Sequence, residues 1–495
     1  MGVIKSQSIY ATLLSYVGVV IGFVTSALVL PKILTPDQLG LTKLIVAVTG
    51  VFAGVFSFGV AQLLFRAYPM FSDDTNKLAK LFYLSIKIAV FGSLVALPFY
   101  YFTTFDLFNV TEPVHDFSKS HFFLFAVFVV IAFRILYLSL FGYVRMSGKI
   151  VIDTFIQNIF LKAGILLIAL LFIFEIVTFT GLVYAQMLLY LFFPLIIILY
   201  LINKKSLPKI PRGVSFSQLE KKEFFQLSLF GTMTTVGSSL YLYLDTLMVN
   251  HYLGEAEVGI YGTLYLFGII VIVPARGLKS VAVSILSKSF KDERLEEIEK
   301  IYKKSSAVLL VVGGYIFLGV YLNLYSVFAY LPDEFAVGGT IVLLIGLAQI
   351  TDMACGVNYE VIASSKHYKL NTWFIFLGAL TGIAFNIIFI PIWGVNGAAF
   401  ATFASLSLIN FARIIAVWKL FGIQPFSLAT LKTFLLMSAV FGIVSFIPNQ
   451  ENFILNLVFK SSLITILYLT PAYYLNLSED LNDIINKTLK RFRIS

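Results

Sequence analysis

The stretch DTLMVNHYLGEAEVGIYGTLYLFGIIVIVPARGLK, residues 245–279, decides how the fold of this chain is interpreted. It contains two apolar segments joined by a short turn, LGEAEVG. It also places one carboxylate, Asp245, and two cations, Arg276 and Lys279, inside those segments. A charge in hydrocarbon costs about 3 kcal/mol on insertion scales, so such a group usually faces a protein-lined cavity. The stretch therefore predicts a polar site embedded in a membrane.

The composition of the whole chain agrees with a membrane protein. Of its 495 residues, 59% are hydrophobic and 13% are charged, and the mean hydropathy is +0.92. Soluble domains carry about 45–50% apolar and about 25% charged residues. The single cysteine, Cys355, and four scattered histidines exclude a disulfide framework and a clustered thiol site, so we expect no metal centre.

The apolar runs predict an all-α membrane protein with fourteen transmembrane helices, because about 20 apolar residues span the hydrocarbon core. The first run is expected to be a retained helix, since no obvious cleavage site follows it. The pattern Ser217-x-x-Glu220 is a capping box that would start the seventh helix. The runs are 8–31, 40–66, 79–103, 120–145, 150–174, 178–202, 224–250, 258–286, 305–329, 336–364, 369–391, 395–421, 427–447 and 452–476.

The distribution of charge predicts the orientation. If the N-terminus is cytoplasmic, most of the Lys and Arg residues fall in cytoplasmic segments, and the outside loops carry mainly acids. Both termini are then cytoplasmic. The net charge of +10 belongs to this face, so it does not indicate a nucleic-acid partner. The outside loops are too short to form a folded extracellular domain.

An internal repeat relates the two halves of the chain. When residues 28–44 are placed over residues 247–264, Gly40 aligns with Gly259, and both copies are a helix, an acidic turn, a glycine and another helix. Six helices separate the copies, so topology is not inverted, as in transporters built from parallel repeats. We therefore expect an N-terminal lobe, a cytoplasmic linker, a C-terminal lobe, and a final pair of helices with a basic tail. These cover residues 1–205, 206–223, 224–425 and 426–495.

Three further motifs carry a resemblance to a known family. PKILTPDQLGL (31–41), FSFGVAQLLFRAYP (56–69) and IPIWGVNGAAFAT (390–402), together with the stretch that begins at Asp245, resemble the polysaccharide-exporter branch of the MOP superfamily. That branch includes the Wzx-type O-antigen flippases and related capsule and teichuronic-acid exporters, and the resemblance runs from the first to the twelfth helix.

The resemblance implies a fold and an activity. It implies two six-helix bundles that face each other in a V and open alternately to either side of a bacterial cytoplasmic membrane. It further implies that an undecaprenyl-diphosphate-linked oligosaccharide is flipped through the bilayer, with coupling to a gradient of Na⁺ or H⁺ and with glycan-assembly proteins as partners.

Cations outnumber acids among the ionisable residues deep inside the runs. Arg134 and Lys162 fall near the bilayer midplane, roughly 15 Å from either interface, so we expect them to face a cavity rather than the headgroups. For Lys279 and Arg413 both alternatives stay open. Arginine holds phosphate oxygens with two parallel hydrogen bonds, and lysine acts as a point charge. The predicted substrate-binding residues are Arg134, Lys162, Arg276, Lys279, Arg413 and Arg66.

The deep acids have two interpretations. Asp245 and Asp352 either pair with Arg276 or Arg413 inside the C-terminal lobe, or one of them binds a coupling proton or Na⁺. Glu360 is expected to face water near the cytoplasmic end of its run. Pro274 can kink the eighth helix, either as a hinge or as an ordinary packing kink.

These observations favour a flippase for a lipid-linked oligosaccharide. A flippase for another polyprenyl-diphosphate lipid, such as the peptidoglycan precursor, would use the same cations. A MATE-type antiporter for small organic cations is less favoured, because its site should be net acidic. We do not expect an enzyme, since the short outside loops carry no evident catalytic triad, metal cluster or phosphate-binding glycine loop.

Overall fold

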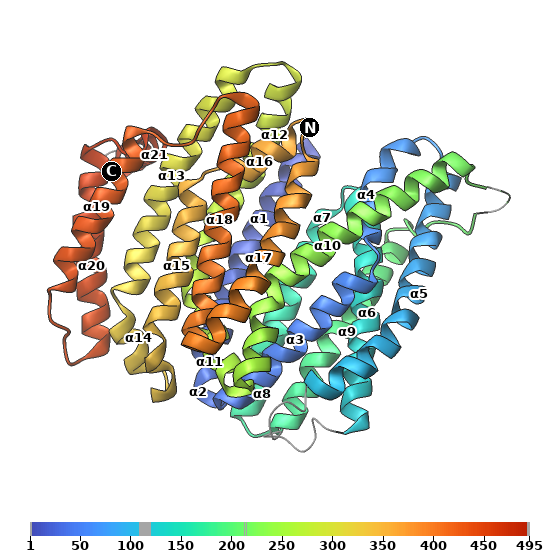
Figure 1. The fold of residues 1–495 in the computed structure, drawn as a ribbon, viewed down its shortest axis with the longest axis horizontal. Coiled ribbons are helices and arrows are strands. Elements are labelled where there is room, and N and C mark those ends of the chain that lie inside the picture. The colour runs from blue at the N-terminus through green and yellow to red at the C-terminus, as the bar shows by residue number, and fades with distance from the viewer. Residues whose placement is uncertain (1, 108–119, 212, 214, 493–495) are drawn as a thin grey trace. The chain divides into compact units, whose positions relative to one another are not determined.

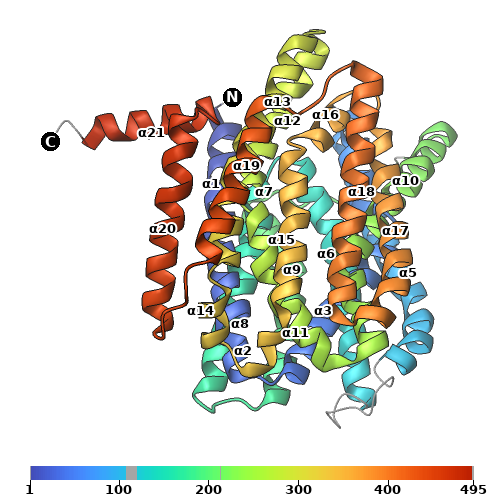
Figure 2. The same ribbon diagram turned by 60° about the vertical axis from the view of Figure 1, so that its left-hand side comes forward.

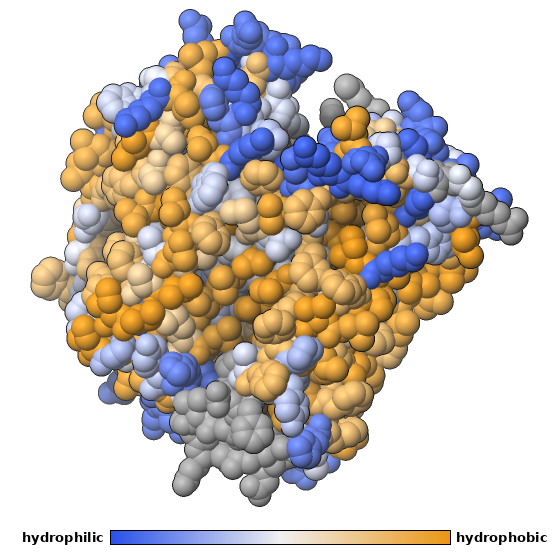
Figure 3. All heavy atoms as spheres, turned by 45° about the vertical axis from the view of Figure 1, so that its right-hand side comes forward, coloured by the Kyte–Doolittle hydropathy of each residue, from blue (hydrophilic) through white to orange (hydrophobic). Residues whose placement is uncertain are grey.

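A computed structural model describes residues 2–107, 120–211, 213 and 215–492, and every regular element in these ranges is a helix. The chain divides into two compact units, unit 1 (Met1–Gly259) and unit 2 (Ile260–Ser495). Figure 3 shows hydrophobic side chains over most of the visible surface, with hydrophilic residues gathered mainly in the upper and lower parts of the view. The expected all-α membrane class is confirmed.

Unit 1 consists of long helices, several of them interrupted (Figure 1). A π-helical turn interrupts the first and the fifth apolar runs, and such turns occur frequently at functional sites. The elements are α1 (Gly2–Phe23), η1 (Val24–Val29), α2 (Leu30–Ile33), α3 (Pro36–Phe56), α4 (Val60–Ala67), η2 (Tyr68–Met70), α5 (Thr75–Leu107), α6 (His121–Met146), α7 (Ile150–Phe155), η4 (Ile156–Phe160), α8 (Leu161–Ile173), α9 (Phe179–Asn203), α10 (Gln218–Leu253) and the start of α11 (Glu255–Ile269), which belongs to unit 2 from Ile260 on.

Unit 2 is built in the same way and ends in three further helices. Figure 2 shows the last of them lying across the end of the helix before it. The elements are η5 (Ile270–Ile272), α12 (Ala275–Lys291), α13 (Leu295–Tyr321), α14 (Leu324–Tyr330), η6 (Asp333–Gly338), α15 (Gly339–Ala354), α16 (Asn358–Ser364), α17 (Lys369–Trp393), α18 (Val395–Phe421), α19 (Leu428–Ser445), α20 (Phe453–Tyr474) and α21 (Glu479–Phe492).

Within the described residues, 13 helices are long and apolar enough to cross a membrane. The one predicted span that is not among these 13 is the seventh, 224–250. It lies in α10, which has 36 residues and begins at the predicted capping box of Ser217 and Glu220. Its many Ser, Thr and Tyr residues make it less apolar than the other spans. At about 1.5 Å per residue, α10 is much longer than the roughly 30 Å hydrocarbon core.

Two spans of unit 2 are discontinuous. The eighth breaks at the 3₁₀ turn Ile270–Ile272, and α12 begins directly after Pro274. The tenth breaks between α15 and α16, where Gly356 has a φ of +59°. A Cβ on Gly356 would lie 2.8 Å from Oγ of Ser305, so both the backbone conformation and the close packing require glycine. In transporters, such broken helices form binding sites at membrane depth.

The two glycines that the repeat aligns lie directly against each other in unit 1. A Cβ on Gly40 would fall 1.8 Å from the carbonyl oxygen of Glu255, and one on Gly259 would fall 2.0 Å from that of Pro36. Nζ of Lys43 donates a hydrogen bond of 3.1 Å to the carbonyl oxygen of Gly259. The close approach of α3 and α11 therefore depends on glycine at both positions.

In unit 2, the final helices share an apolar core with α13 and α15. Val440 of α19 and Ile464 of α20 are buried in the same cluster as Leu310 of α13 and Ile350 of α15. The hydroxyl of Tyr468 donates to the carbonyl oxygen of Val311 at 3.0 Å. The last pair of apolar runs is therefore packed firmly onto unit 2.

Candidate functional site

Arg134 lies where four helices of unit 1 meet. From α6, its Nη1 donates to the carbonyl oxygen of Val46 at 3.0 Å and to Oγ1 of Thr49 at 2.7 Å, both on α3. Nη2 lies 3.4 Å from the hydroxyl of Tyr243 on α10, and the guanidinium carbon lies 5.1 Å above the ring of Tyr190 on α9. These contacts hold the side chain inside unit 1. Because a guanidinium has five N–H donors, they leave donors for an anion.

One turn along α6 from Arg134, Tyr137 contacts a half-buried carboxylate, Asp153. The hydroxyl of Tyr137 donates a short hydrogen bond to Oδ1 of Asp153. Nε2 of Gln157 donates to the same carboxylate oxygen at 2.9 Å and lies 3.0 Å from the hydroxyl of Tyr137. Asp153 is on α7, close to the π-helical turn Ile156–Phe160. A carboxylate held only by neutral donors inside a membrane segment is a natural proton or cation acceptor.

The remaining predicted residues of unit 1 lie on different helices. Lys162, on α8, is half-buried and its stem packs on α1, because a Cβ on Gly22 would lie 2.7 Å from its Cδ. Arg66 is half-buried on α4. Asp245 is half-buried on α10, two residues after Tyr243. It therefore belongs to the unit that holds Arg134.

A buried polar chain crosses unit 2 beside the two helix breaks. Nζ of Lys279 on α12 lies 2.6 Å from Oδ2 of Asp352 on α15. Nδ2 of Asn410 on α18 donates to Oδ1 of Asp352 at 3.3 Å, and Nδ2 of Asn358 on α16 donates to Oδ1 of Asn410 at 3.0 Å. The ammonium of Lys279 thus holds the place beside Asp352 that Arg276 or Arg413 was expected to take.

Arg413 and Glu360 are buried charges with unused hydrogen-bonding capacity. Arg413 on α18 is 9% exposed, its guanidinium carbon lies 5.3 Å above the ring of Tyr359, and Nε has no hydrogen-bond partner among the described residues. Glu360 is 7% exposed, and its Oε2 likewise lacks a partner there. The expectation that Glu360 faces water was wrong, because α16 packs against α12 and α18 and Glu360 is buried there. A buried, unsatisfied charge is costly unless a ligand or water meets it.

Arg276 lies apart from the hydrogen-bonded group of Lys279, Asp352, Asn410 and Asn358. It occupies the first turn of α12 and is exposed on unit 2. A cation at a helix N-terminus gains nothing from the helix dipole, so its position there is not explained by helix stability. No group of three or more metal-ligating side chains is found in the described part of the chain.

Sequence reasoning missed Asp153 and Asn410. Asp153 lies near the start of its apolar run, so its depth alone did not mark it. The spacing Asp153-x-x-x-Gln157, two polar residues one turn apart on an apolar helix, was an available signal. Asn410 is one of many amides, and only the fold shows that it bridges Asn358 and Asp352.

Comparisons with known proteins agree on a membrane transporter fold. The profile of the family described as "Polysaccharide biosynthesis protein" matches residues 4–271. A curated relative, the probable flippase AglR of Haloferax volcanii, is 25% identical over 206 residues, which are 38% of this chain and 40% of that relative's length. The chain thus spans about two fifths of the curated relative that it matches.

Solved structures of several transporters share the fold. The lipid II flippase MurJ in an inward closed conformation has a TM-score of 0.67 at 14% identity, covering 98% of this chain and 100% of that one. An inward-facing multidrug resistance MATE family transporter of the MOP superfamily has a TM-score of 0.62 at 14% identity, covering 83% and 94%. A MOP superfamily transporter from Pyrococcus furiosus has a TM-score of 0.57 at 13% identity, covering 85% and 96%.

Proposed function

This chain belongs to the polysaccharide biosynthesis protein family, and we propose that it is a flippase that moves a polyprenyl-diphosphate-linked oligosaccharide across the cytoplasmic membrane. The observation that carries the proposal is the presence of an inward-held arginine in each unit. Arg134 in unit 1 and Arg413 in unit 2 lie in helices long and apolar enough to cross a membrane. Three contacts of Arg134 leave part of its five N–H donors for an anion, and Nε of Arg413 has no hydrogen-bond partner among the described residues. A diphosphate that leaves water needs such donors, since arginine binds phosphate oxygens in pairs.

The aromatic and amide side chains beside these arginines support the same substrate class. Tyr190 and Tyr243 flank Arg134, and Tyr359 flanks Arg413. Hydroxyl and amide groups can hydrogen-bond sugars, and the rings offer apolar faces to them. We infer alternating access in which cations of both units bind the diphosphate, with Lys162, Arg276, Lys279 and Arg66 as further contributors. The N- and C-termini are assigned to the cytoplasm, because the Lys and Arg residues concentrate in the segments on that side.

The coupling ion is assigned to a carboxylate of unit 1. Asp352 lies 2.6 Å from Lys279 and accepts a hydrogen bond from Asn410, so we interpret Lys279 and Asp352 as a structural ion pair. Asp153 receives hydrogen bonds from Tyr137 and Gln157 and has no ion pair among the described residues. Asp153 is therefore a better acceptor for a coupling proton or Na⁺ than Asp352, and Asp245 on α10 stays a second candidate.

A second candidate is a flippase for another polyprenyl-diphosphate lipid, such as the peptidoglycan precursor. The cations would serve it equally, and the fold aligns with the full length of a lipid II flippase. Transport of both lipids by the purified protein separates the candidates. A small-cation antiporter is disfavoured, because the polar interior holds Arg134, Lys162 and Arg413 in addition to the neutralised pair of Lys279 and Asp352.

The test uses the full chain in proteoliposomes with a fluorescent polyprenyl-diphosphate glycan. Arg134→Lys keeps the charge but loses the paired hydrogen bonds, which are worth about 1.5–3 kcal/mol, so flipping at low substrate should fall about 10–100-fold. Lys162→Ala should also reduce flipping. Lys87→Ala is the matched control, since Lys87 is an exposed lysine of α5. Wild-type flipping by both Arg134→Lys and Lys162→Ala would remove these residues from the mechanism.

A further inference from the structure

A cavity of about 230 Å³ lies beside the first half of α13 in unit 2, and we call it the polar cavity because most of its lining residues are polar or charged. This volume is well above the roughly 10–15 Å³ that a single water molecule needs, so the cavity can take a small polar group. Its wall combines both signs of charge and hydroxyl groups with apolar surface from Ala307, Val308, Ala429 and Leu477. The side chains that matter here are Lys303 and Lys304 of α13, Ser427, Ser478, and Glu479 and Asp480 at the start of α21.

The charges around this cavity are balanced and accessible. Nζ of Lys304 lies 2.8 Å from Oε2 of Glu479 and 3.8 Å from Oδ1 of Asp480. Lys303 lies 2.6 Å from Glu299 on the same helix. The side chains of Lys304 and Glu479 are 39% and 67% exposed, so each can exchange its present partner for a ligand at little cost.

An apolar cavity of about 100 Å³ lies next to the polar one. Both cavities are lined by Ser478, and along α13 the lining passes from Ala307 and Val308 in the first to Val311 and Val312 one turn further on. Tyr315, Leu469, Leu481 and Ile485 complete the second wall. The two cavities therefore follow each other along α13, and we call the surface that they line the amphipathic path.

We propose that this path binds a zwitterionic aminophospholipid of the phosphatidylethanolamine type, with its headgroup in the polar cavity and the start of an acyl chain along α13. The phosphate would accept hydrogen bonds from Lys303 and Lys304, and the primary ammonium would donate to Glu479 and Asp480. Lys304, Glu479 and Asp480 then exchange their present ion pairs for pairs with the lipid, and Lys303 exchanges the partly exposed Glu299 for the phosphate. An anionic lipid has no cationic group to pair with Glu479 and Asp480. A quaternary ammonium headgroup has no N–H to donate to them.

The position of α21 indicates which contact a bound lipid would stabilise. Figure 2 shows α21 lying across the end of α20, as an interfacial helix lies along a membrane surface. Leu477 and Ser478, in the turn between the two helices, are 2% and 5% exposed. A lipid that contacts α13, α20 and α21 together would fasten α21 to the core of unit 2.

The test is thermal unfolding of the purified full chain in detergent with added phospholipids of identical acyl chains. Phosphatidylethanolamine should raise the midpoint by at least about 2 °C relative to phosphatidylcholine and phosphatidylglycerol. The double variant Lys303→Ala/Lys304→Ala should lose this difference. Lys291→Ala, at an exposed lysine of α12, is the control and should keep it. Equal shifts with all three lipids, or a preserved difference in the double variant, would overturn the proposal.

Two variants keep the proposal open to refutation if the double variant does not fold. Val312→Trp fills the apolar cavity and should abolish the ethanolamine-specific shift while the lipid-free midpoint stays close to wild type. Glu479→Gln/Asp480→Asn removes the acceptors for the ammonium, so phosphatidylglycerol should now stabilise as well as phosphatidylethanolamine. An unchanged lipid preference in either variant would contradict the assigned headgroup orientation.

Discussion

Arg413 and Lys279 carry the same charge in the same unit, yet their surroundings predict opposite responses to removal of that charge. Lys279→Met leaves Asp352 buried without its ion pair, which should lower the free energy of unfolding by about 3–5 kcal/mol. Arg413 has no hydrogen bond or ion pair in the described part of the chain, so Arg413→Met should leave stability unchanged or raise it. Denaturant unfolding measures both, and Lys279→Met/Asp352→Leu should recover most of the loss. A large destabilisation by Arg413→Met would show that Arg413 is structural.

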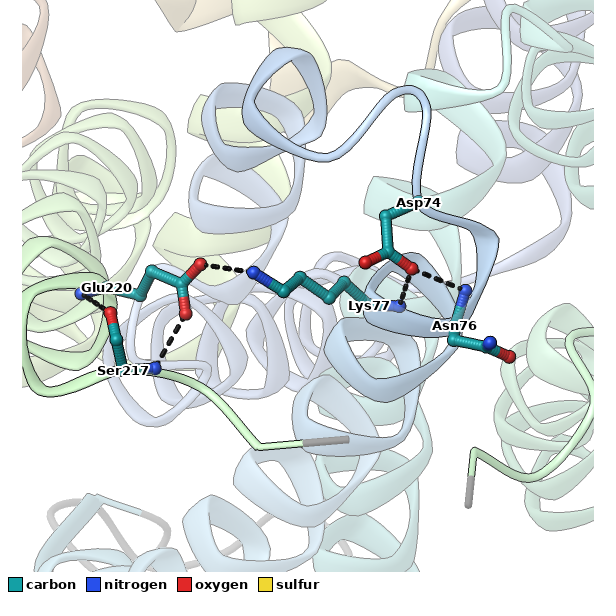
Figure 4. A network of polar contacts seen from close by, with 5 residues as sticks. All are labelled: Asp74, Asn76, Lys77, Ser217 and Glu220. Atoms are coloured by element: carbon teal, nitrogen blue, oxygen red, sulfur yellow. Dashed lines mark hydrogen bonds and ion pairs between the residues drawn. The ribbon is translucent and has the colours of Figure 1, made fainter. Parts of the chain in front are cut away.

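The start of α10 predicts a dependence of stability on acid pH. Nζ of Lys77 donates to Oε1 of Glu220 at 2.7 Å, and the backbone N–H of Ser217 donates to Oε2 (Figure 4). These bonds lower the pKa of the Glu220 carboxyl. The ionised pair therefore stabilises the fold above the unfolded-state pKa of about 4.3, and the contribution is lost as pH falls through the lower folded-state pKa. As the pH falls from about 5 to about 3, wild type should lose more stability than Lys77→Met. Parallel curves of stability against pH for the two proteins would show that the ion pair of Lys77 and Glu220 does not stabilise the fold.

At the scale of elements, the contact between α3 and α11 is the sharpest packing constraint in unit 1. Gly40→Ala places a methyl group 1.8 Å from a backbone oxygen, which cannot yield as a side chain would. Overpacking of this kind costs about 1–3 kcal/mol. Gly442→Ala in α19 is the control, because nothing lies within 4 Å of its added Cβ, and it should gain up to about 1 kcal/mol of helix stability. Thermal unfolding compares them, and equal midpoints would refute the constraint.

The same elements show which features of the fold can be predicted from sequence patterns and which cannot. Apolar runs predicted the spans, because the bilayer demands uniform hydrophobicity over a fixed length, and the capping box placed the start of α10. Pro274 signalled the break before α12. The break at Gly356 carried no such signal, since single glycines are common in apolar runs. Glu360 was therefore assigned to water from its depth in a straight helix, and the pairing of Asp352 with Lys279 depends on where two broken helices meet.

For the whole molecule, the family and fold were accessible from ordered motifs and spacing, and both are confirmed by the family match and the structural relatives. The chemistry inside each unit was less accessible. Arg134 was identified by its depth, but its contacts with Thr49, Tyr190 and Tyr243 come from three other helices. No pattern along one helix reports what faces it from another. Which charges are neutralised is consequently a property of the tertiary structure.

The proposed mechanism makes a prediction about the two units together. If Arg134 and Arg413 serve one diphosphate during a single transport cycle, the loss of either should slow the same process. The flipping rate of Arg134→Ala/Arg413→Ala should then fall by less than the product of the two single losses, because groups that act as a unit are not additive. Arg134→Ala/Lys87→Ala, which pairs the mutation with an exposed lysine, should instead show the single loss alone. Flipping assays in proteoliposomes with matched protein content supply the rates. Losses that multiply in full would mean that the two arginines act on independent events, and a single diphosphate passing both units would have to be abandoned.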